Sequence, residues 1–129
     1  MGAHTTDLSA ANFESFVAKD GIVFVDFWAA WCGPCRSFAP IYEAAAGRHH
    51  DIVWGKVDTD AEQELAGAFN IRSIPTLMIF RDGIALFQHS GTLPAPVLDE
   101  LVTKAKEIDM ADVKKQLEKE ATQSETKPS

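Results

Sequence analysis

Cys32 and Cys35 are the only two thiols of this chain, and they lie three positions apart around Gly33 and Pro34. At this spacing two thiols can close a small disulfide, supply half of a metal site, or cycle between the dithiol and the disulfide. Thiols that merely fill space are a further alternative, but burial gives no reason for the Gly-Pro pair between them. The residue types and their spacing therefore favour redox or metal chemistry.

The composition of the chain separates these uses. With 129 residues, 46% of them hydrophobic, it can bury the core of one domain without disulfide staples. A single C-x-x-C in a chain without other cysteines is typical of a reducing compartment, so we expect a cytoplasmic protein. A zinc site needs about four ligands, and here His49 and His50 would have to come from a distant loop. We therefore expect redox chemistry and no metal, with a metal site as the weaker alternative.

Charge and hydropathy disfavour two classes of partner. The formal net charge of −7 repels phosphate backbones, and the basic residues are scattered along the chain. The longest unbroken apolar run, residues 27–32, is too short to span a bilayer, and the N-terminus has no signal-peptide pattern. We expect a monomer that binds neither nucleic acid nor membranes.

Alternating strands and helices are predicted around the cysteine pair. Residues 22–28 are apolar on both faces apart from Asp26, as a central parallel strand covered by helices requires. Asp82-Gly83 between two apolar runs is typical of an antiparallel hairpin. The pattern predicts an α/β fold with a central mixed β-sheet flanked by helices on both faces. Helices are expected over 9–19 with Ser9 as the cap, from the cysteines to Gly47 with Pro40 inside, over 61–69 and over 94–108, and further strands over 52–57, 77–80 and 84–87.

The junction between a strand and a helix gives the two thiols different chemistry. A thiolate attacks a disulfide, and Cys32 is expected at a helix N-terminus, where free amides and the helix dipole favour negative charge. Cys35, one turn later, is expected to lie deeper and to resolve the mixed disulfide. Pro34 supplies neither an N–H nor a charge to stabilise a thiolate, which favours reduction of target disulfides over oxidation.

Asp26 is the most anomalous charged residue, because it interrupts a strand that otherwise reads as buried. A carboxyl group in an apolar core takes up a proton, so we expect its pKa to be raised toward the working pH. Such a group can pass a proton to and from Cys35, which must ionise to attack. The alternative is an exposed strand position.

The ordered set of motifs resembles the thioredoxin family over about residues 5–108. The motifs are Val25 to Arg36, Pro40, Lys56 to Asp58, Ile71 to Thr76, and Gly91. The resemblance implies a thioredoxin fold and a protein-disulfide reductase that uses Cys32 and Cys35. It also implies that no cofactor is bound, and that a flavin-containing thioredoxin reductase drawing on NADPH restores the dithiol.

The resemblance assigns roles to further positions. Lys56 matches a lysine that lies near the buried acid and modulates it. Pro75 matches a cis-proline beside the cysteines, whose turn frees the backbone of Ile74 to pair with an extended peptide, and an ordinary trans proline is the alternative. Trp28 is expected to pack against the site. A shallow apolar groove for disulfide-containing protein substrates would comprise Trp31, Gly33, Pro34, Ile74, Pro75 and Gly91.

Some positions depart from the most familiar pattern of the family. Arg36 replaces the usual lysine, which keeps the charge and changes its geometry. Ser90 and Thr92 flank Gly91 where the family often has Val and Ala. These differences put substrate preference in doubt and leave the reaction unchanged. Solvated surface positions are expected for His4, His49, His50 and His89.

Residues 109–129 lie beyond the resemblance, so we expect a domain over 1–108 and a separate extension. Asp109 can cap an amphipathic helix over about 110–121, and the composition after Thr122 predicts a disordered tail. The helix would be half-solvated, packed back on the domain, or docked to a partner. Its narrow apolar stripe consists of Met110, Val113, Leu117 and Ala121.

A non-enzymatic function is compatible with the same fold. A binding or chaperone-like subunit could hold a partner in the apolar groove while its cysteines are incidental or regulatory. The intact pair Cys32 and Cys35 argues against this alternative.

Overall fold

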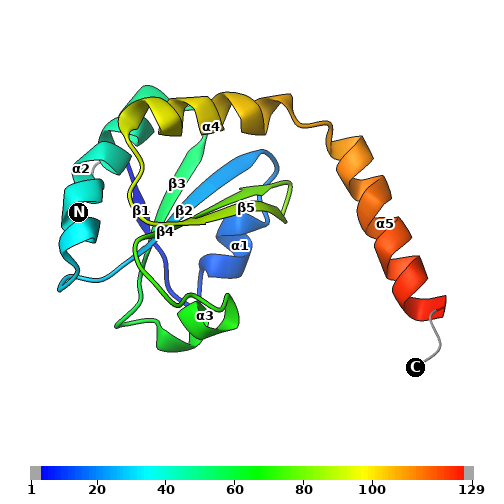
Figure 1. The fold of residues 1–129 in the computed structure, drawn as a ribbon, viewed down its shortest axis with the longest axis horizontal. Coiled ribbons are helices and arrows are strands. Elements are labelled where there is room, and N and C mark those ends of the chain that lie inside the picture. Colours follow the sequence, from blue (N-terminus) through cyan, green and yellow to red (C-terminus); the bar gives the residue numbers. More distant parts are fainter. Residues whose placement is uncertain (1–3, 127–129) are drawn as a thin grey trace.

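The computed structural model describes residues 4–126. In this part of the chain, five strands form one mixed sheet (Figure 1). The strands are β1 (Thr6–Asp7), β2 (Ile22–Trp28), β3 (Val53–Asp58), β4 (Thr76–Arg81) and β5 (Ile84–Ser90), in the order β1-β3-β2-β4-β5. Strand β3 pairs in parallel with β1 and β2, and β4 pairs antiparallel with β2 and β5. The predicted mixed sheet is therefore present, with β2 at its centre.

Helices cover both faces of this sheet, and the last helix stands away from it (Figure 1). The helices are α1 (Phe13–Val17), α2 (Gly33–Arg48), α3 (Gln63–Ala68), α4 (Ala95–Glu107) and α5 (Met110–Thr126). One core cluster joins α2 and α4 to one face of the sheet, and a second joins α1 and α3 to the other. No helix among residues 4–126 is both long and apolar enough to cross a bilayer.

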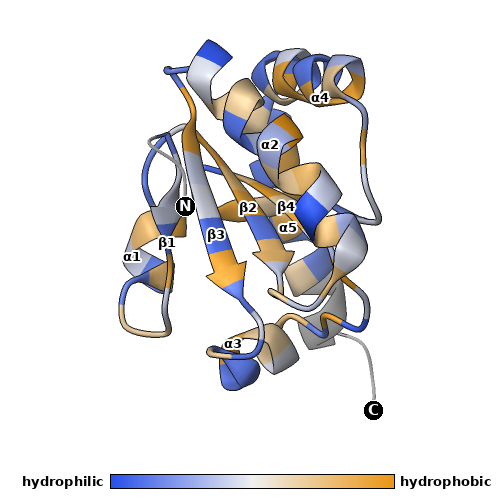
Figure 2. Cartoon of the chain, turned by 90° about the vertical axis from the view of Figure 1, so that its left-hand side faces the viewer, coloured by the Kyte–Doolittle hydropathy of each residue, from blue (hydrophilic) through white to orange (hydrophobic). Residues whose placement is uncertain are grey.

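Strand β2 contributes to both core clusters because its side chains alternate between the two faces. Phe24 packs on the side of α2 and α4, with its ring centroid 4.4 Å from that of Trp54. Val25 and Phe27 point to the opposite side and are fully buried there. Figure 2 shows β2 as mainly hydrophobic, as its coverage by helices requires.

Two helices are shorter than the sequence predicts, since side chains stabilise turns before them. Ser9 does not cap α1, because the Asn12 carboxamide oxygen accepts the Ser9 N–H at 2.6 Å and α1 begins only after Asn12. Similarly, a carboxylate oxygen of Asp58 accepts the N–H groups of Asp60 and Ala61, which form a turn before α3. Such local bonds compete with the helix for the backbone.

Arg81 holds the backbone between α4 and α5. Its guanidinium Nη1 donates to the carbonyls of Ala105 at 2.8 Å and Ile108 at 2.7 Å, at the end of α4. The predicted helix over 110–121 is present and continues to Thr126. The part of the predicted tail after Thr126 lies outside the described residues.

A pair of glycines tests how tightly the core is packed. A Cβ at Gly55 of β3 would lie 2.6 Å from Leu8 Cδ1 and 3.0 Å from Phe16 Cε1, so Gly55→Ala should lower the free energy of unfolding by about 1–3 kcal/mol. Gly67 in α3 is the matched control: a Cβ there meets nothing within 4 Å, and Gly67→Ala should raise that free energy by about 0.5–1 kcal/mol. Urea unfolding measures both, and equal effects would contradict this packing.

Candidate active site

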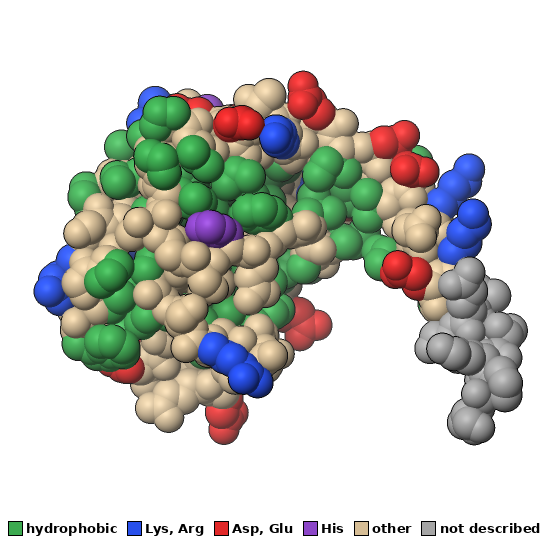
Figure 3. Space-filling view, in the orientation of Figure 1, with side chains coloured by type: hydrophobic (Ala, Val, Ile, Leu, Met, Phe, Trp, Pro, Cys, Tyr) green, Lys and Arg blue, Asp and Glu red, His purple; other side chains and the backbone are tan. Residues whose placement is uncertain are grey.

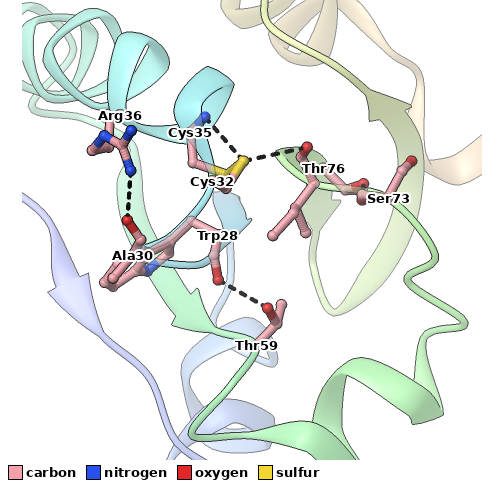
Figure 4. Close-up of a disulfide and its surroundings, with 9 residues drawn as sticks. Trp28, Ala30, Cys32, Cys35, Arg36, Thr59, Ser73 and Thr76 are labelled. Atoms are coloured by element: carbon pink, nitrogen blue, oxygen red, sulfur yellow. Dashed lines mark hydrogen bonds between the residues drawn. A yellow bond between two sulfur atoms is a disulfide. The ribbon is translucent and has the colours of Figure 1, made fainter.

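The two cysteines lie at the N-terminus of α2, where β2 gives way to that helix. Cys32 is the N-cap residue, and its Sγ accepts the backbone N–H of Cys35 at 3.2 Å (Figure 4). The two residues form a disulfide, with their Cα atoms 5.2 Å apart. Pro34 lies in the first turn, where a helix has no need of its N–H. The strand-to-helix placement predicted for the thiols is therefore found.

The exposed fraction does not distinguish the two thiols as the sequence predicted. Cys35 was expected to lie deeper, yet Cys32 is 4% exposed and Cys35 is 3% exposed in the disulfide form. Both pack with Ala29, which is fully buried beside them, and with the half-buried Trp28 and Ile74. The difference between the thiols lies in their positions on α2.

The loop before β4 brings a distant segment to the disulfide. The peptide bond between Ile74 and Pro75 is cis, and the carbonyl oxygen of Ile74 lies 3.6 Å from Cys32 Sγ. The Gly91 N–H donates to the Pro75 carbonyl at 2.8 Å. Thr76 supports the same turn, because its hydroxyl donates to the Ser73 carbonyl at 2.6 Å. Ile74 and Cys32 are 42 positions apart in the sequence, so this contact arises only in the folded chain.

The residues expected to form the apolar groove differ in exposure. Trp31 has 68% of its surface accessible, and Pro34 is also exposed. Gly33, Ile74 and Gly91 are half-buried, whereas Pro75 is buried.

Asp26 is buried, and the alternative of an exposed strand position is wrong. It is 1% exposed, and its Oδ1 has no hydrogen-bond partner among the described residues. Burial raises its pKa from 3.8 to about 7, and the positive charge of Lys56 partly opposes this rise. Lys56 stands opposite Asp26 in the register of β2 and β3, and its Nζ lies 4.9 Å from the centre of the Trp28 ring.

A cavity of about 160 Å³ touches both Asp26 and Cys35. Lys56 and Arg36 are also among its lining residues. A cavity of this size, with charged residues in its lining, has room for water, which can carry a proton between groups that do not touch. The structure thus connects the buried acid with the second thiol through a space that the sequence could not reveal.

Two backbone supports near the site were not predicted from the sequence. The guanidinium Nη1 of Arg36 donates to the Ala30 carbonyl at 2.9 Å, and so braces the loop before the cysteines (Figure 4). The carbonyl of Trp28 accepts both the N–H of Thr59 at 2.8 Å and its hydroxyl at 3.0 Å. A threonine or arginine at these positions gives no signal of its own, because the acceptors are backbone groups.

Two further predictions concern residues along α2. Pro40 lies within the helix at an exposed position and is not among the residues lining the cavity. His49 was expected to be solvated and is not: only 23% of its side chain is exposed, and its Nε2 lies 2.7 Å from Asp99 Oδ1. This contact ties the end of α2 to α4. Within residues 4–126, no group of three or more His, Cys, Asp or Glu side chains is arranged to hold a metal.

Comparison with known proteins agrees with this geometry. The family model described as Thioredoxin matches residues 4–104. The chain belongs to the thioredoxin family. It is accordingly a protein-disulfide oxidoreductase, and the Cys32–Cys35 pair is its redox-active disulfide. Thioredoxins in general bind no cofactor, and exchange electrons with thioredoxin reductases and disulfide-bonded proteins.

Individual relatives cover most of the chain. The chain is 46% identical over 120 residues to "Putative thioredoxin 2" of Streptomyces coelicolor, an alignment covering 93% of this chain and 90% of that protein. It is 41% identical over 97 residues to a thioredoxin of Bacillus subtilis, covering 73% and 93% respectively. The solved structure of a mutant thioredoxin from Halobacterium salinarum superposes with a TM-score of 0.76 at 28% identity, covering 84% of this chain and 97% of that one. The thioredoxin fold expected from the sequence is thus confirmed.

The alignment with the Streptomyces coelicolor relative continues beyond residue 108 into the extension. It takes in 120 of the 129 residues, so at most nine residues lie outside it and most of α5 lies within it.

The raised pKa of Asp26 makes stability depend on pH. Between about pH 4 and pH 7 the folded chain keeps a proton that the unfolded chain has lost, so the free energy of unfolding falls as pH rises through this window. The slope approaches about 1.4 kcal/mol per pH unit and flattens above pH 7. Asp26→Asn should therefore be more stable than the parent at pH 8, with a gain that shrinks toward pH 4.

Urea unfolding at a series of pH values measures this difference. Asp20→Asn, at an exposed position, is the matched control and should follow the parent at every pH. A stability difference between Asp26→Asn and the parent that does not vary with pH would contradict the burial of a protonated carboxyl group.

Proposed function

We propose that Cys32 is the attacking thiol of a protein-disulfide reductase and that Cys35 is the resolving thiol. The main support for this assignment is that Cys32 is the N-cap of the 16-residue helix α2, where its Sγ accepts a hydrogen bond from the Cys35 N–H. This position favours a thiolate because the helix N-terminus attracts negative charge. The Ile74 carbonyl beside the same sulfur marks the side on which a substrate backbone would lie.

The reaction moves two electrons from the dithiol to the target. The Cys32 thiolate attacks one sulfur of the target disulfide, that S–S bond breaks, and the released target thiolate takes up a proton. Cys35 then loses its proton and attacks Cys32 Sγ, so the mixed disulfide breaks and the second target thiolate leaves. The products are a reduced target and the Cys32–Cys35 disulfide.

Asp26 would accept the proton of Cys35 in the second step. Its pKa of about 7 allows it to exist in both protonation states near neutral pH, and the cavity it shares with Cys35 offers a route for that proton. Lys56 would modulate Asp26, because its charge lowers the pKa that burial raises.

Substrates would bind in a shallow groove beside the disulfide. Exposed Trp31 offers apolar contact, and the backbone of Ile74 would pair with an extended segment of the target. Trp28 and Pro40 would serve as structural residues near the site. The proposed groove consists of Trp31, Gly33, Pro34, Ile74, Pro75 and Gly91.

Membership of the family also supports a proposal for the source of electrons. A thioredoxin reductase drawing on NADPH would return the Cys32–Cys35 disulfide to the dithiol, with no cofactor held by this chain. The single C-x-x-C pair and the family suggest action in the cytoplasm.

The roles of the two thiols predict opposite behaviour of their serine variants. Cys35→Ser can still attack a target disulfide but cannot release it, so it should accumulate mixed disulfides with target proteins. Cys32→Ser is the matched control and should accumulate few, since it lacks the attacking thiol. Non-reducing electrophoresis of proteins captured from a cell extract measures both. Equal trapping would show that the roles are assigned wrongly, and partner capture by the double serine variant would favour a binding function.

The proposed proton transfer predicts a change in the pH dependence of turnover. Asp26→Asn should slow reduction of a disulfide-bonded test protein, with dithiothreitol as donor, by at least about tenfold near pH 7. It should also remove the inflection near pH 7 that titration of Asp26 gives the parent. A slower variant with an unchanged pH profile would indicate a structural role only.

A further inference from the structure

The cavity shared by Asp26 and Cys35 has two exposed residues in its lining, Ala30 and Arg36. The outer rim of the cavity is therefore formed by the loop before the cysteines and by a side chain near the start of α2. The other lining residues are buried or half-buried, and they are Asp26, Trp28, Ala29, Cys35, Ala39 and Lys56.

A hydrogen bond joins the two rim residues across the cavity. Nη1 of Arg36 donates to the Ala30 carbonyl at 2.9 Å (Figure 4). The second terminal nitrogen, Nη2, lies 3.9 Å from the position that a Cβ would take on Gly33. Both partners precede residue 36, so the side chain runs back over the first turn of α2 toward the loop.

The chemistry of arginine suits a cover over this rim. Its aliphatic stem can lie on protein surface while the guanidinium stays in water. The planar guanidinium has two terminal nitrogens, so one can hold Ala30 while the other lies over Gly33. A lysine, which the family usually has here, carries a single ammonium group and cannot make both contacts from separate nitrogens.

We propose that Arg36 is a positioning residue of the redox site, and that its side chain closes the cavity between Asp26 and Cys35 against bulk water. This inference rests on the proposed proton transfer between these two groups. With the guanidinium held at Ala30, water inside the cavity can carry the proton and is kept apart from the solvent outside. The proton then moves between the carboxyl group and the thiol without passing through bulk water.

The groups that face Asp26 leave Arg36 a role different from that of Lys56. Lys56 on β3 is buried, and its positive charge lowers the pKa of Asp26 against the larger effect of burial. Burial is thus the main cause of the raised pKa, and a cover over the cavity preserves it. The remaining neighbours of Asp26 are Cys35 in the cavity wall, Tyr42 on α2 and Leu77 opposite it on β4.

A cover and a charge predict opposite effects when Arg36 is removed. Loss of a cover admits water to Asp26, which stabilises the carboxylate and lowers the pKa of Asp26. Loss of a nearby positive charge destabilises the carboxylate and raises that pKa. The direction of the change therefore separates the two roles.

The test is the titration of Asp26, followed by the chemical shift of its carboxyl carbon in the full chain. The Cys32–Cys35 disulfide is kept intact, since disulfide-bonded cysteines do not titrate beside the acid. Arg36→Ala should move the titration midpoint toward acid by at least about half a pH unit, because water reaches the carboxylate.

Arg48→Ala is the matched control for this titration. Arg48 is also partly exposed on α2, and it bonds Asp99 about 18 Å along the helix from Arg36. The variant removes the same charge beyond the screening length, so its Asp26 midpoint should stay within about 0.2 pH unit of the parent. An Asp26 midpoint that is unchanged or moves toward alkaline pH in Arg36→Ala would overturn the proposal, as would an equal acid shift in Arg48→Ala.

Turnover separates this cover from the proposed proton transfer. With dithiothreitol as donor, the inflection in the pH profile of disulfide reduction should move toward acid in Arg36→Ala, together with the Asp26 titration. Adding Arg36→Ala to Asp26→Asn should leave the pH profile unchanged, because the titrating group is absent. If the titration moves and the turnover profile does not follow it, Arg36 covers the cavity and the assigned proton transfer is wrong.

Discussion

Strand β2 is buried on both of its faces, and this burial determines where the polar chemistry of the molecule can occur. Its apolar side chains join the core under α2 and α4 on one side and the core over α1 on the other. The strand carries Asp26 into the buried interior and ends at the loop that leads into Cys32. Strand β2 thus carries the acid and leads into the helix whose N-terminus holds the redox pair.

The burial of Asp26 is unfavourable for the charged form of its carboxyl group. A carboxyl group in water would be ionised well below neutral pH, whereas this one has a pKa of about 7. Lys56 limits the rise, because its positive charge favours the carboxylate from the neighbouring strand. The same burial lowers the free energy of unfolding at alkaline pH, where the carboxylate has to be charged in the folded chain.

The two ends of the molecule use apolar surface differently. Beside the disulfide, Trp31 is exposed, and the carbonyl oxygen of Ile74 lies 3.6 Å from Cys32 Sγ. At the other end, a groove between α4 and β5 has mainly apolar lining residues (Figure 3), and Leu117 of α5 is 43% exposed. Arg81 holds the carbonyl of Ile108 just before α5, and the later turns of α5 project from the domain.

Local patterns in the sequence were sufficient where one physical effect dominates. The apolar run at 22–28 predicted β2 with its correct ends, and its single acid predicted a buried carboxyl group. The ordered motifs predicted the family, and with it the cis bond before Pro75, which propensity alone would not favour. The predictions failed where a side chain found a partner distant in sequence or competed with the backbone: His49 bonds Asp99, and Asn12 delays α1.

Tertiary structure alone decided the features that need several distant segments at once. The sequence determined which residues can exchange electrons and protons, because thiols three positions apart and an acid among apolar residues have few other uses. It did not determine the cavity shared by Asp26 and Cys35, or the exit of α5 held by Arg81. Each depends on distances between elements that are set by the packing of the whole core, and no local pattern encodes such distances.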